Sequence, residues 1–280
     1  MAVCEVCFRH CKLNEGETGA CRARVCREGK SVAANYGMVT GLALDPIEKK
    51  PLYRFESGSL ILSAGSYGCN LKCPFCQNVD ISLADGREKA EAEYVSPEEL
   101  CSIAIRYRNR GNIGVAYTYN EPLVGYEYVR DTAKLVRRAG MKNVLVTNGC
   151  VMPEVLEELK LYIDAMNIDL KCFNEKYYRD VLKGDLETVK SFISRALGFG
   201  HVELTTLIIP GENDSEEEME ALSSWVHEQE LAAGKDIALH ITRFFPRSRY
   251  SDRMPTEVGK IYRLAEVARR RLKYVYEGNV

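Results

Sequence analysis

Short apolar runs alternate with amphipathic helical patterns from residue 59 to the end of the chain. The runs are rich in Val, Ile and Leu and show little polar alternation, which is typical of strands buried on both faces of a parallel sheet. Six runs are therefore predicted as strands, over residues 59–65, 113–119, 142–147, 165–171, 201–210 and 236–244.

A helical pattern follows each predicted strand. The clearest one, Ser96–Gly111, has Ser96 as N-cap, Pro97 at the first helical position, Glu99 completing a capping box and Gly111 at the end. The other helices are predicted over residues 123–140, 153–162, 186–199, 215–234 and 256–272.

This alternation predicts an α/β fold with a parallel sheet covered by helices. A closed eight-fold barrel needs about two more strand–helix pairs, so the expected fold is a partial, open (β/α)6 barrel. It occupies residues 36–280, beginning with a connecting strand and loops over 36–58. Residues 1–35 form a separate small, Cys-rich, metal-binding segment, because they lack the aliphatic residues for a core.

Composition narrows the setting of this fold. The 280 residues carry a formal net charge of −2, which does not favour a general nucleic-acid binder. No apolar run reaches the roughly 18 residues of a membrane span, and the Cys-rich N-terminus does not resemble a secretory signal. We therefore predict a cytoplasmic protein, in which thiols stay reduced and the clusters among its 11 cysteines are metal sites.

One cluster lies directly after the first predicted strand. Cys69, Cys73 and Cys76 have the spacing C-x3-C-x2-C, within the sequence GCNLKCPFCQN. Structural zinc sites and ferredoxin cubanes both use four protein ligands. Three thiolates can hold three irons of a [4Fe–4S] cluster and leave the fourth iron open for a ligand that is not protein. The alternative is a zinc site that takes its fourth ligand from elsewhere.

This loop, with Phe75 before its last cysteine, resembles the radical S-adenosylmethionine (SAM) superfamily. The resemblance implies that Cys69, Cys73 and Cys76 bind the [4Fe–4S] cluster and that SAM ligates the open iron. It further implies that one electron cleaves SAM to a 5′-deoxyadenosyl radical, which abstracts hydrogen from a substrate. We assign no catalytic residue beyond the cluster ligands.

Polar residues at later strand ends resemble those of the pyruvate formate-lyase activating enzymes and other glycyl-radical activases. The superfamily usually has Gly-Gly-Glu-Pro after the second strand, where this chain has Tyr-Asn-Glu-Pro. Without the resemblance, Asn-Glu-Pro and the later Asn-Gly would each be read as a turn. The Asp-Lys pair at the end of the fourth strand would be an ordinary ion pair, and the histidine of the sixth strand an ordinary polar residue. The resemblance assigns them to the SAM pocket: Glu121, Thr147, Asn148, Gly149, Asp169, Lys171 and His240.

A narrower resemblance is to the radical SAM enzyme of the AmmeMemoRadiSam system. It is carried by DPIEKKPLYRF (Asp45–Phe55), GCNLKCPFCQN, AYTYNEP (Ala116–Pro122) and HITRFFP (His240–Pro246). It implies Memo-like and AMMECR-like partner proteins, but it does not name a substrate. The wider resemblance to the radical SAM superfamily and its glycyl-radical activases implies a protein substrate and an electron donor of the reduced ferredoxin or flavodoxin type.

A second cysteine cluster lies at the N-terminus, with the spacing C-x2-C-x3-C-x9-C. Four thiolates make a closed site, for which structural Zn²⁺ and a second [4Fe–4S] cluster both suit the spacing. The C-x2-C opening slightly favours zinc. The predicted ligands are Cys4, Cys7, Cys11 and Cys21, with His10 and Cys26 as substitutes.

The expected function is that of a radical SAM oxidoreductase resembling glycyl-radical activating enzymes. An alternative substrate is a small molecule or RNA, although Arg22, Arg24 and Arg27 form only a thin basic patch. An alternative of another class is a non-catalytic, zinc-binding adaptor. Metal content distinguishes these classes, since the enzyme holds about four irons per chain and the adaptor holds zinc.

Overall fold

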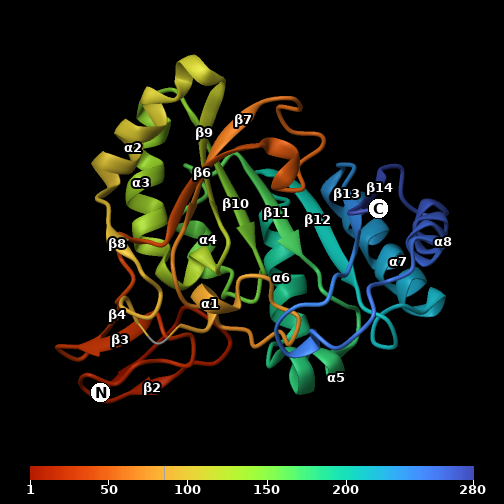
Figure 1. The fold of residues 1–280 in the computed structure, drawn as a ribbon, viewed down its shortest axis with the longest axis horizontal. Coiled ribbons are helices and arrows are strands. Elements are labelled where there is room, and N and C mark those ends of the chain that lie inside the picture. The colour runs from red at the N-terminus through yellow and green to blue at the C-terminus, as the bar shows by residue number, and fades with distance from the viewer. Residues whose placement is uncertain (85) are drawn as a thin grey trace.

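An eight-stranded sheet forms the centre of the molecule in the computed structural model, which describes residues 1–84 and 86–280 (Figure 1). Its strand order is β14-β13-β12-β11-β10-β9-β7-β6. The pairs from β7 to β14 are parallel, and β6 pairs antiparallel with β7. The sheet is open, because β6 and β14 form two separate edges. Its strands are β6 (Gly41–Pro46), β7 (Leu60–Gly65), β9 (Asn112–Thr118), β10 (Lys142–Thr147), β11 (Ala165–Asp169), β12 (His201–Ile208), β13 (Ala238–Arg243) and β14 (Val275–Gly278).

The predicted parallel α/β sheet is confirmed. β10 has the predicted bounds, and the ends of the other five predicted strands differ by one or two residues. The pattern did not predict β14, which pairs with β13 and adds a seventh parallel strand. β14 has four residues, three of them only half-buried, so it lacks the apolar run that marks the other strands.

The helices follow the strands along the chain, and α2 packs beside α3 as α7 packs beside α8 (Figure 1). The predicted N-cap is confirmed, since Ser96 Oγ accepts a hydrogen bond from the Glu99 amide at 3.1 Å. The helix predicted over 153–162 is shorter, because turns that bury Leu159 and Ile163 replace its second half. The helices are α1 (Val79–Ser82), α2 (Pro97–Arg106), α3 (Tyr126–Arg138), α4 (Glu154–Glu157), α5 (Glu175–Tyr177), α6 (Leu186–Ala196), α7 (Glu216–Ala233) and α8 (Val258–Arg269), with the 3-10 segments η1 (Ile47–Lys49), η2 (Arg108–Arg110), η3 (Pro122–Gly125) and η5 (Ser248–Tyr250) and the π segment η4 (Tyr178–Leu182).

The N-terminal residues form small hairpins against one end of this layer (Figure 1). Arg24 on the second hairpin donates to Glu127 of α3 at 2.7 Å, which fixes the hairpin to the barrel. The boundary predicted at residue 35 stays a prediction. The short strands form three antiparallel pairs, β1 (Ala2–Val3) with β2 (Lys12–Leu13), β3 (Arg24–Arg27) with β4 (Lys30–Ala33), and β5 (Met38–Val39) with β8 (Glu93–Tyr94).

Residues 47–55 close the amino end of the sheet. Ile47 and Leu52 are fully buried against Ile61, Ala116, Val144 and Ala165 of the strands. The Pro51 carbonyl accepts a hydrogen bond from Asn167 of β11 at 2.9 Å. We call residues 47–55 the plug. Because the plug closes the amino end of the sheet, a site is expected at the carboxyl ends of the parallel strands.

Within residues 1–84 and 86–280, no helix combines the length and the apolar character needed to cross a membrane.

Candidate active site at the carboxyl ends of the strands

The three-cysteine loop leaves the end of β7 and packs directly on the N-terminal segment. Gly68 has a φ of 91°, and a Cβ added there would lie 2.6 Å from the Cβ of Ala23 and 2.7 Å from the carbonyl oxygen of Cys21. Glycine is therefore required at position 68. The next amide, that of Cys69, donates to the same Cys21 carbonyl at 3.1 Å.

The thiols of this loop lie close to one another. Burial and the neighbouring Cys73 thiolate raise the pKa of Cys69 well above its usual value, and burial raises the pKa of Cys73 to about 11. Cys76 raises both pKa values as well. The three thiols are therefore within electrostatic reach of one another.

An asparagine pair links the loop to the end of β10. Asn148 Nδ2 lies 3.6 Å from Cys69 Sγ and donates to Asn70 Oδ1 at 2.9 Å. Asn70 Nδ2 in turn donates to the Cys150 carbonyl at 2.6 Å. Sequence reasoning did not assign Asn70, although it lies inside the cysteine motif.

Glu121 is buried beside this pair. One carboxylate oxygen accepts from Thr147 Oγ1 at 2.7 Å and the other from the Asn148 amide at 2.7 Å. Burial raises the pKa of Glu121 to about 7. The Leu123 amide also donates to Glu121 at 3.0 Å, and because a carboxylate has about four acceptor sites, one is left for an ammonium group. The structure thus brings together Glu121, Thr147, Asn148 and Cys69.

The two residues before Glu121, where the superfamily usually has glycines, compensate by specific contacts. Tyr119 has a φ of 74°, a region that glycine adopts readily and tyrosine rarely. Its hydroxyl donates to Asp45 at 2.9 Å. Asn120 Nδ2 donates to the carbonyls of Tyr67 and Gly68 at 3.1 and 3.0 Å. These bonds hold the strained turn in place.

Asp169 and Lys171 form a pair at the end of β11, with the Lys171 ammonium 2.7 Å from Asp169 Oδ2. Burial lowers the pKa of Lys171, but Asp169 and the thiolates of Cys73 and Cys69 outweigh it and raise this pKa above its usual value. Lys171 is therefore a fixed positive charge within electrostatic reach of two of the three loop cysteines.

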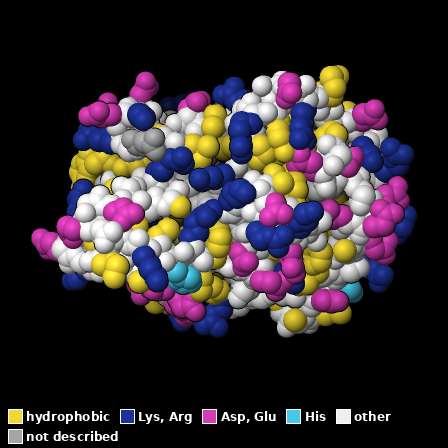
Figure 2. Space-filling model, turned by 90° about the horizontal axis from the view of Figure 1, so that it is seen from below, with side chains coloured by type: hydrophobic (Ala, Val, Ile, Leu, Met, Phe, Trp, Pro, Cys, Tyr) yellow, Lys and Arg dark blue, Asp and Glu magenta, His cyan; other side chains and the backbone are white. Residues whose placement is uncertain are grey.

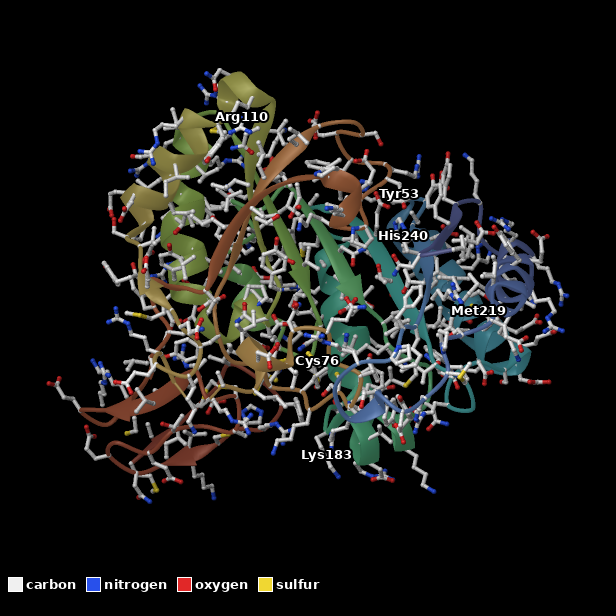
Figure 3. All side chains as sticks on the ribbon, in the orientation of Figure 1. Tyr53, Cys76, Arg110, Lys183, Met219 and His240 are labelled. Carbon is white, nitrogen blue, oxygen red and sulfur yellow. The ribbon has the colours of Figure 1, made fainter. Side chains whose placement is uncertain are left out.

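His240 lies apart from this group. Its Nε2 bonds to the buried Glu203 of β12 at 2.6 Å, and its ring contacts Tyr53 of the plug at 4.7 Å between centroids. Figure 3 shows His240 beside Tyr53 and well separated from Cys76. Its assignment to the SAM pocket stays a prediction, and the structure gives it a place beside the plug.

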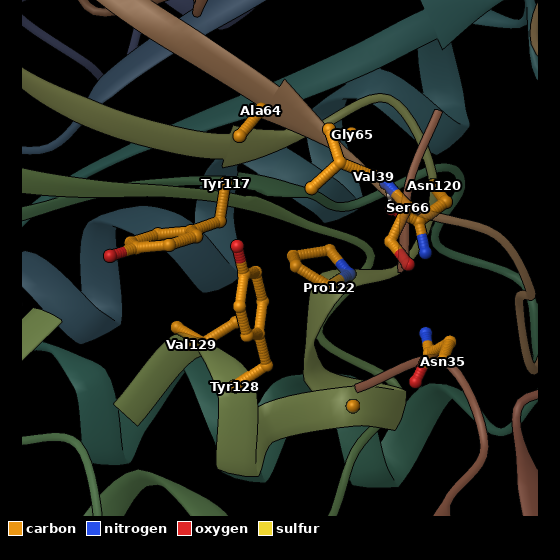
Figure 4. Close-up of a pocket in the computed structure, with 11 residues that line it drawn as sticks. Asn35, Val39, Ala64, Gly65, Ser66, Tyr117, Asn120, Pro122, Tyr128 and Val129 are labelled. Atoms are coloured by element: carbon orange, nitrogen blue, oxygen red, sulfur yellow. Dashed lines mark hydrogen bonds between the residues drawn. The ribbon is translucent and has the colours of Figure 1, made fainter. Parts of the chain in front are cut away.

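A small cavity lies behind the Asn120–Pro122 turn (Figure 4). Its ≈ 20 Å³ is about the size of one water molecule. In the part of the chain that the structure describes, the buried Asn35 Oδ1 beside it has no hydrogen-bond partner. This cavity suits a bound water and is too small for SAM or a substrate.

The comparison with known proteins gives this arrangement its family. The sequence pattern of the Radical SAM superfamily matches residues 64–222, which include the cysteine loop, Glu121 and Lys171. The chain belongs to the radical SAM superfamily. It is 40% identical over 279 residues to the uncharacterized protein MJ0808 of Methanocaldococcus jannaschii, covering 99% of this chain and 81% of that one.

Two further proteins are similar to this chain. A putative glycyl-radical enzyme activating enzyme, MJ1227 of the same organism, is 28% identical over 217 residues, covering 73% of this chain and 82% of its own. The solved structure of Streptococcus suis SuiB bound to S-adenosylmethionine is similar in fold, with a TM-score of 0.59 and 15% identity over 76% of this chain and 48% of that one. The narrower resemblance to the AmmeMemoRadiSam enzyme stays a prediction.

The residues present suit the cofactors that a radical SAM family implies. The cysteine loop offers three thiols, the turn after β9 offers the buried Glu121 carboxylate, and the end of β11 offers Lys171. These groups match iron, an ammonium and a carboxylate in chemistry. Among residues 1–84 and 86–280, no three or more His, Cys, Asp or Glu side chains already have the geometry of a metal site. The ligand assignments of individual cysteines therefore stay predictions.

The N-terminal cysteines of this radical SAM protein also lie near one another. Burial, together with the charges of Cys21, Cys4 and Cys11, raises the pKa of Cys7 to about 11. The Cys4 amide donates to the Cys11 carbonyl at 3.0 Å, which folds the segment back on itself.

Both predicted substitute ligands have other contacts. Cys26 donates to Glu15 at 3.7 Å, and His10 bonds to Glu5 at 2.9 Å. Zinc or a second cluster at Cys4, Cys7, Cys11 and Cys21 stays a prediction.

Replacing Cys4 and Cys7 together with Ser tests this N-terminal site. The segment has few apolar residues, so we expect loss of a metal to expose residues 1–30 to protease. Limited proteolysis with mass spectrometry measures this, and Cys101→Ser on α2 is the control. Full protection of the double variant, together with unchanged metal content, would contradict a metal at these cysteines.

Proposed function

We propose that this protein is a radical SAM enzyme that abstracts a hydrogen atom from a substrate, as a glycyl-radical activating enzyme does with a protein target. The observation that carries the proposal is the continuous contact from Cys69 through Asn148 to Glu121, with Lys171 within electrostatic reach of Cys69 and Cys73. A zinc adaptor has no need of a buried carboxylate and a lysine beside its cysteines.

When bound, the cluster supplies the electron that cleaves SAM to the 5′-deoxyadenosyl radical. The chain's own residues have the following proposed roles. Cys69, Cys73 and Cys76 hold three irons. Glu121 accepts a hydrogen bond from the SAM ammonium, and Thr147 and Asn148 orient the Glu121 carboxylate for it. Lys171, paired with Asp169, places a positive charge near the cluster thiolates and so offsets their negative charge.

The substrate and partners are proposed at the level of class. The relative named as a putative glycyl-radical enzyme activating enzyme supports a protein target. A reduced ferredoxin or flavodoxin is the proposed electron donor, and Memo-like and AMMECR-like proteins are proposed partners from the sequence motifs. Small-molecule or RNA substrates remain the alternative.

Anaerobic incubation with SAM and a chemical reductant tests this function. The protein, reconstituted with iron and sulfide, is expected to release 5′-deoxyadenosine, measured by liquid chromatography and mass spectrometry. Candidate partner proteins are then added one at a time, and the substrate is the one that increases the yield. Absence of 5′-deoxyadenosine from protein that holds about four irons per chain would refute the proposal.

Glu121→Gln is expected to weaken SAM binding by about tenfold or more, which corresponds to about 1.5–3 kcal/mol. The variant removes the negative charge that meets the SAM ammonium. Isothermal titration under anaerobic conditions measures the affinity, and iron content should stay unchanged. Glu154→Gln, an exposed residue of α4, is the matched control. Equal SAM affinity of the Gln variant and the control would contradict the role of Glu121.

A further inference from the structure

We infer that the outer side of the cysteine loop is the docking surface for an acidic one-electron carrier protein. This surface, called the loop face below, surrounds a hollow of ≈ 290 Å³. The inference rests on the proposed function, because it names the partner that delivers the electron. The hollow is lined by Lys72, Pro74, Asp180, Val181, Lys183, Arg249 and Tyr250.

The loop face is formed by the segments that follow the carboxyl ends of β7, β11 and β13. The Lys72 amide donates to the Leu182 carbonyl at 2.8 Å, and Arg249 donates to the Lys72 carbonyl at 2.9 Å. Phe75 and Tyr250 contact each other at 6.2 Å between centroids. The cysteine loop is therefore held rigid from outside, as a surface for rapid docking needs.

The loop face is adjacent to the predicted cluster but separate from the predicted SAM site. Lys72 and Pro74 flank Cys73 in the chain, so a protein seated on them lies one residue from a predicted iron ligand. None of the residues predicted to bind SAM lines the hollow. This position suits delivery of an electron to the cluster better than binding of the molecule that is oxidised.

The charge of the loop face decides the class of partner. Figure 2 shows the molecule from the side of this loop, with a band of Lys and Arg side chains across the middle. Asp180 is paired with Arg179 at 3.0 Å and Asp80 with Arg247 at 3.8 Å. Lys72, Lys183 and Arg249 line the hollow, and Arg9 donates to the Lys183 carbonyl beside them.

The basic side chains nearest the cysteine motif keep their charge available. Among the described residues, no ion pair joins Lys72, Lys183 or Arg249 to a carboxylate, and Arg9 donates to the carbonyls of Asn70 and Lys183. The whole chain has a net charge of −2, so this local excess is not a consequence of composition. A basic surface with Tyr and Pro at its centre is complementary to an acidic protein, whose approach it accelerates.

The carrier transfers one electron to the cluster and leaves oxidised, so the carrier must bind briefly and weakly. Electrostatic complementarity gives such encounters a high association rate and strong salt dependence. An acidic substrate protein is the competing occupant of this surface, and the experiment separates the two.

The test uses the double variant Lys72→Glu/Lys183→Glu of the reconstituted holoenzyme. Both side chains are exposed, and neither is a predicted ligand of iron or SAM. The matched control is Arg106→Glu/Arg110→Glu, which makes the same charge change at the far end of the molecule; Figure 3 labels Arg110 at the top and Lys183 at the bottom. Binding of a flavodoxin is measured by biolayer interferometry at low and high salt.

We expect the loop-face variant to bind flavodoxin about tenfold or more weakly at low salt, and the control variant to bind it as the unmodified protein does. 5′-Deoxyadenosine formation driven by reduced flavodoxin should fall by a similar factor. Formation driven by dithionite should stay unchanged. Salt should weaken binding of the unmodified protein and affect the loop-face variant little.

Three results would overturn the inference. They are unchanged flavodoxin binding in the loop-face variant, an equal loss in the control, and a loss of dithionite-driven SAM cleavage. Failure of the proposed function looks different, because the unmodified protein would then form no 5′-deoxyadenosine with any reductant, while flavodoxin binding still reports on the surface.

Discussion

Cys73→Ser is expected to remove about four irons per chain and to abolish 5′-deoxyadenosine formation. A cubane left with two protein thiolates is poorly retained, and Cys73 lies between the other two predicted ligands and near Lys171. Iron is measured by colorimetric assay after anaerobic reconstitution, and SAM cleavage by mass spectrometry. We expect a complete loss of iron and of SAM cleavage, because no contact of the loop among the described residues supplies a replacement for the third ligand.

Cys101→Ser provides the control, since Cys101 is a buried cysteine of α2 outside both motifs. It should keep its iron and its activity. If Cys73→Ser retained the iron content and SAM cleavage of this control, the assignment of the loop cysteines would be wrong.

Glu203→Gln is expected to destabilise the fold by about 3 kcal/mol at pH 7. Glu203 is fully buried on β12 and accepts hydrogen bonds from His201 and His240, and from the amides of Tyr53 and Arg54 at 3.1 and 2.8 Å. Glutamine offers one acceptor oxygen, so buried donors lose their partner. Urea denaturation measures the free energy of unfolding, and Glu228→Gln on the exposed face of α7 is the control.

The same carboxylate predicts how stability depends on pH. Burial raises the pKa of Glu203, but hydrogen bonds from His201, His240 and the two amides outweigh it and lower the pKa from 4.5 to about 2. A lowered folded-state pKa stabilises the protein above pH 4.5, and this contribution is lost as the pH falls toward 2. The difference between unmodified protein and Glu203→Gln should therefore narrow below pH 4.5. A constant difference down to pH 3 would contradict the ionised role of Glu203.

The sequence pattern predicted the sheet because the buried parallel strands contain short apolar runs, as β10 does at residues 144–146. It did not predict the plug, because residues 47–55 read as a polar loop although Ile47 and Leu52 are fully buried. Their burial depends on strands that are distant in the sequence. The helix over 153–162 was too long for a similar reason, since tertiary packing of Leu159 and Ile163 outweighs the local helical pattern.

The structure brings predicted site residues together where they lie next to strand ends, and their role as a SAM pocket stays a prediction. Glu121, Thr147 and Asn148 come together because parallel strands end at the same edge. His240 was assigned to the SAM pocket because it lies on the sixth predicted strand. Its side chain instead hydrogen-bonds to Glu203, a contact that depends on the pairing of β12 with β13.

The contact between Asp45 and Tyr119 was not predicted from the sequence. Their hydrogen bond joins residues 74 positions apart, and no local spacing in the sequence signals such a contact.

The most direct test of the central claim is low-temperature electron paramagnetic resonance of the anaerobically reconstituted, dithionite-reduced protein, with and without SAM. We expect the signal of a reduced [4Fe–4S] cluster that changes when SAM is added, because SAM is proposed to ligate the iron left open by the predicted ligands Cys69, Cys73 and Cys76. Cys73→Ser should lack this SAM-sensitive signal. A cluster signal that SAM leaves unchanged, or a protein that holds only zinc, would contradict the account.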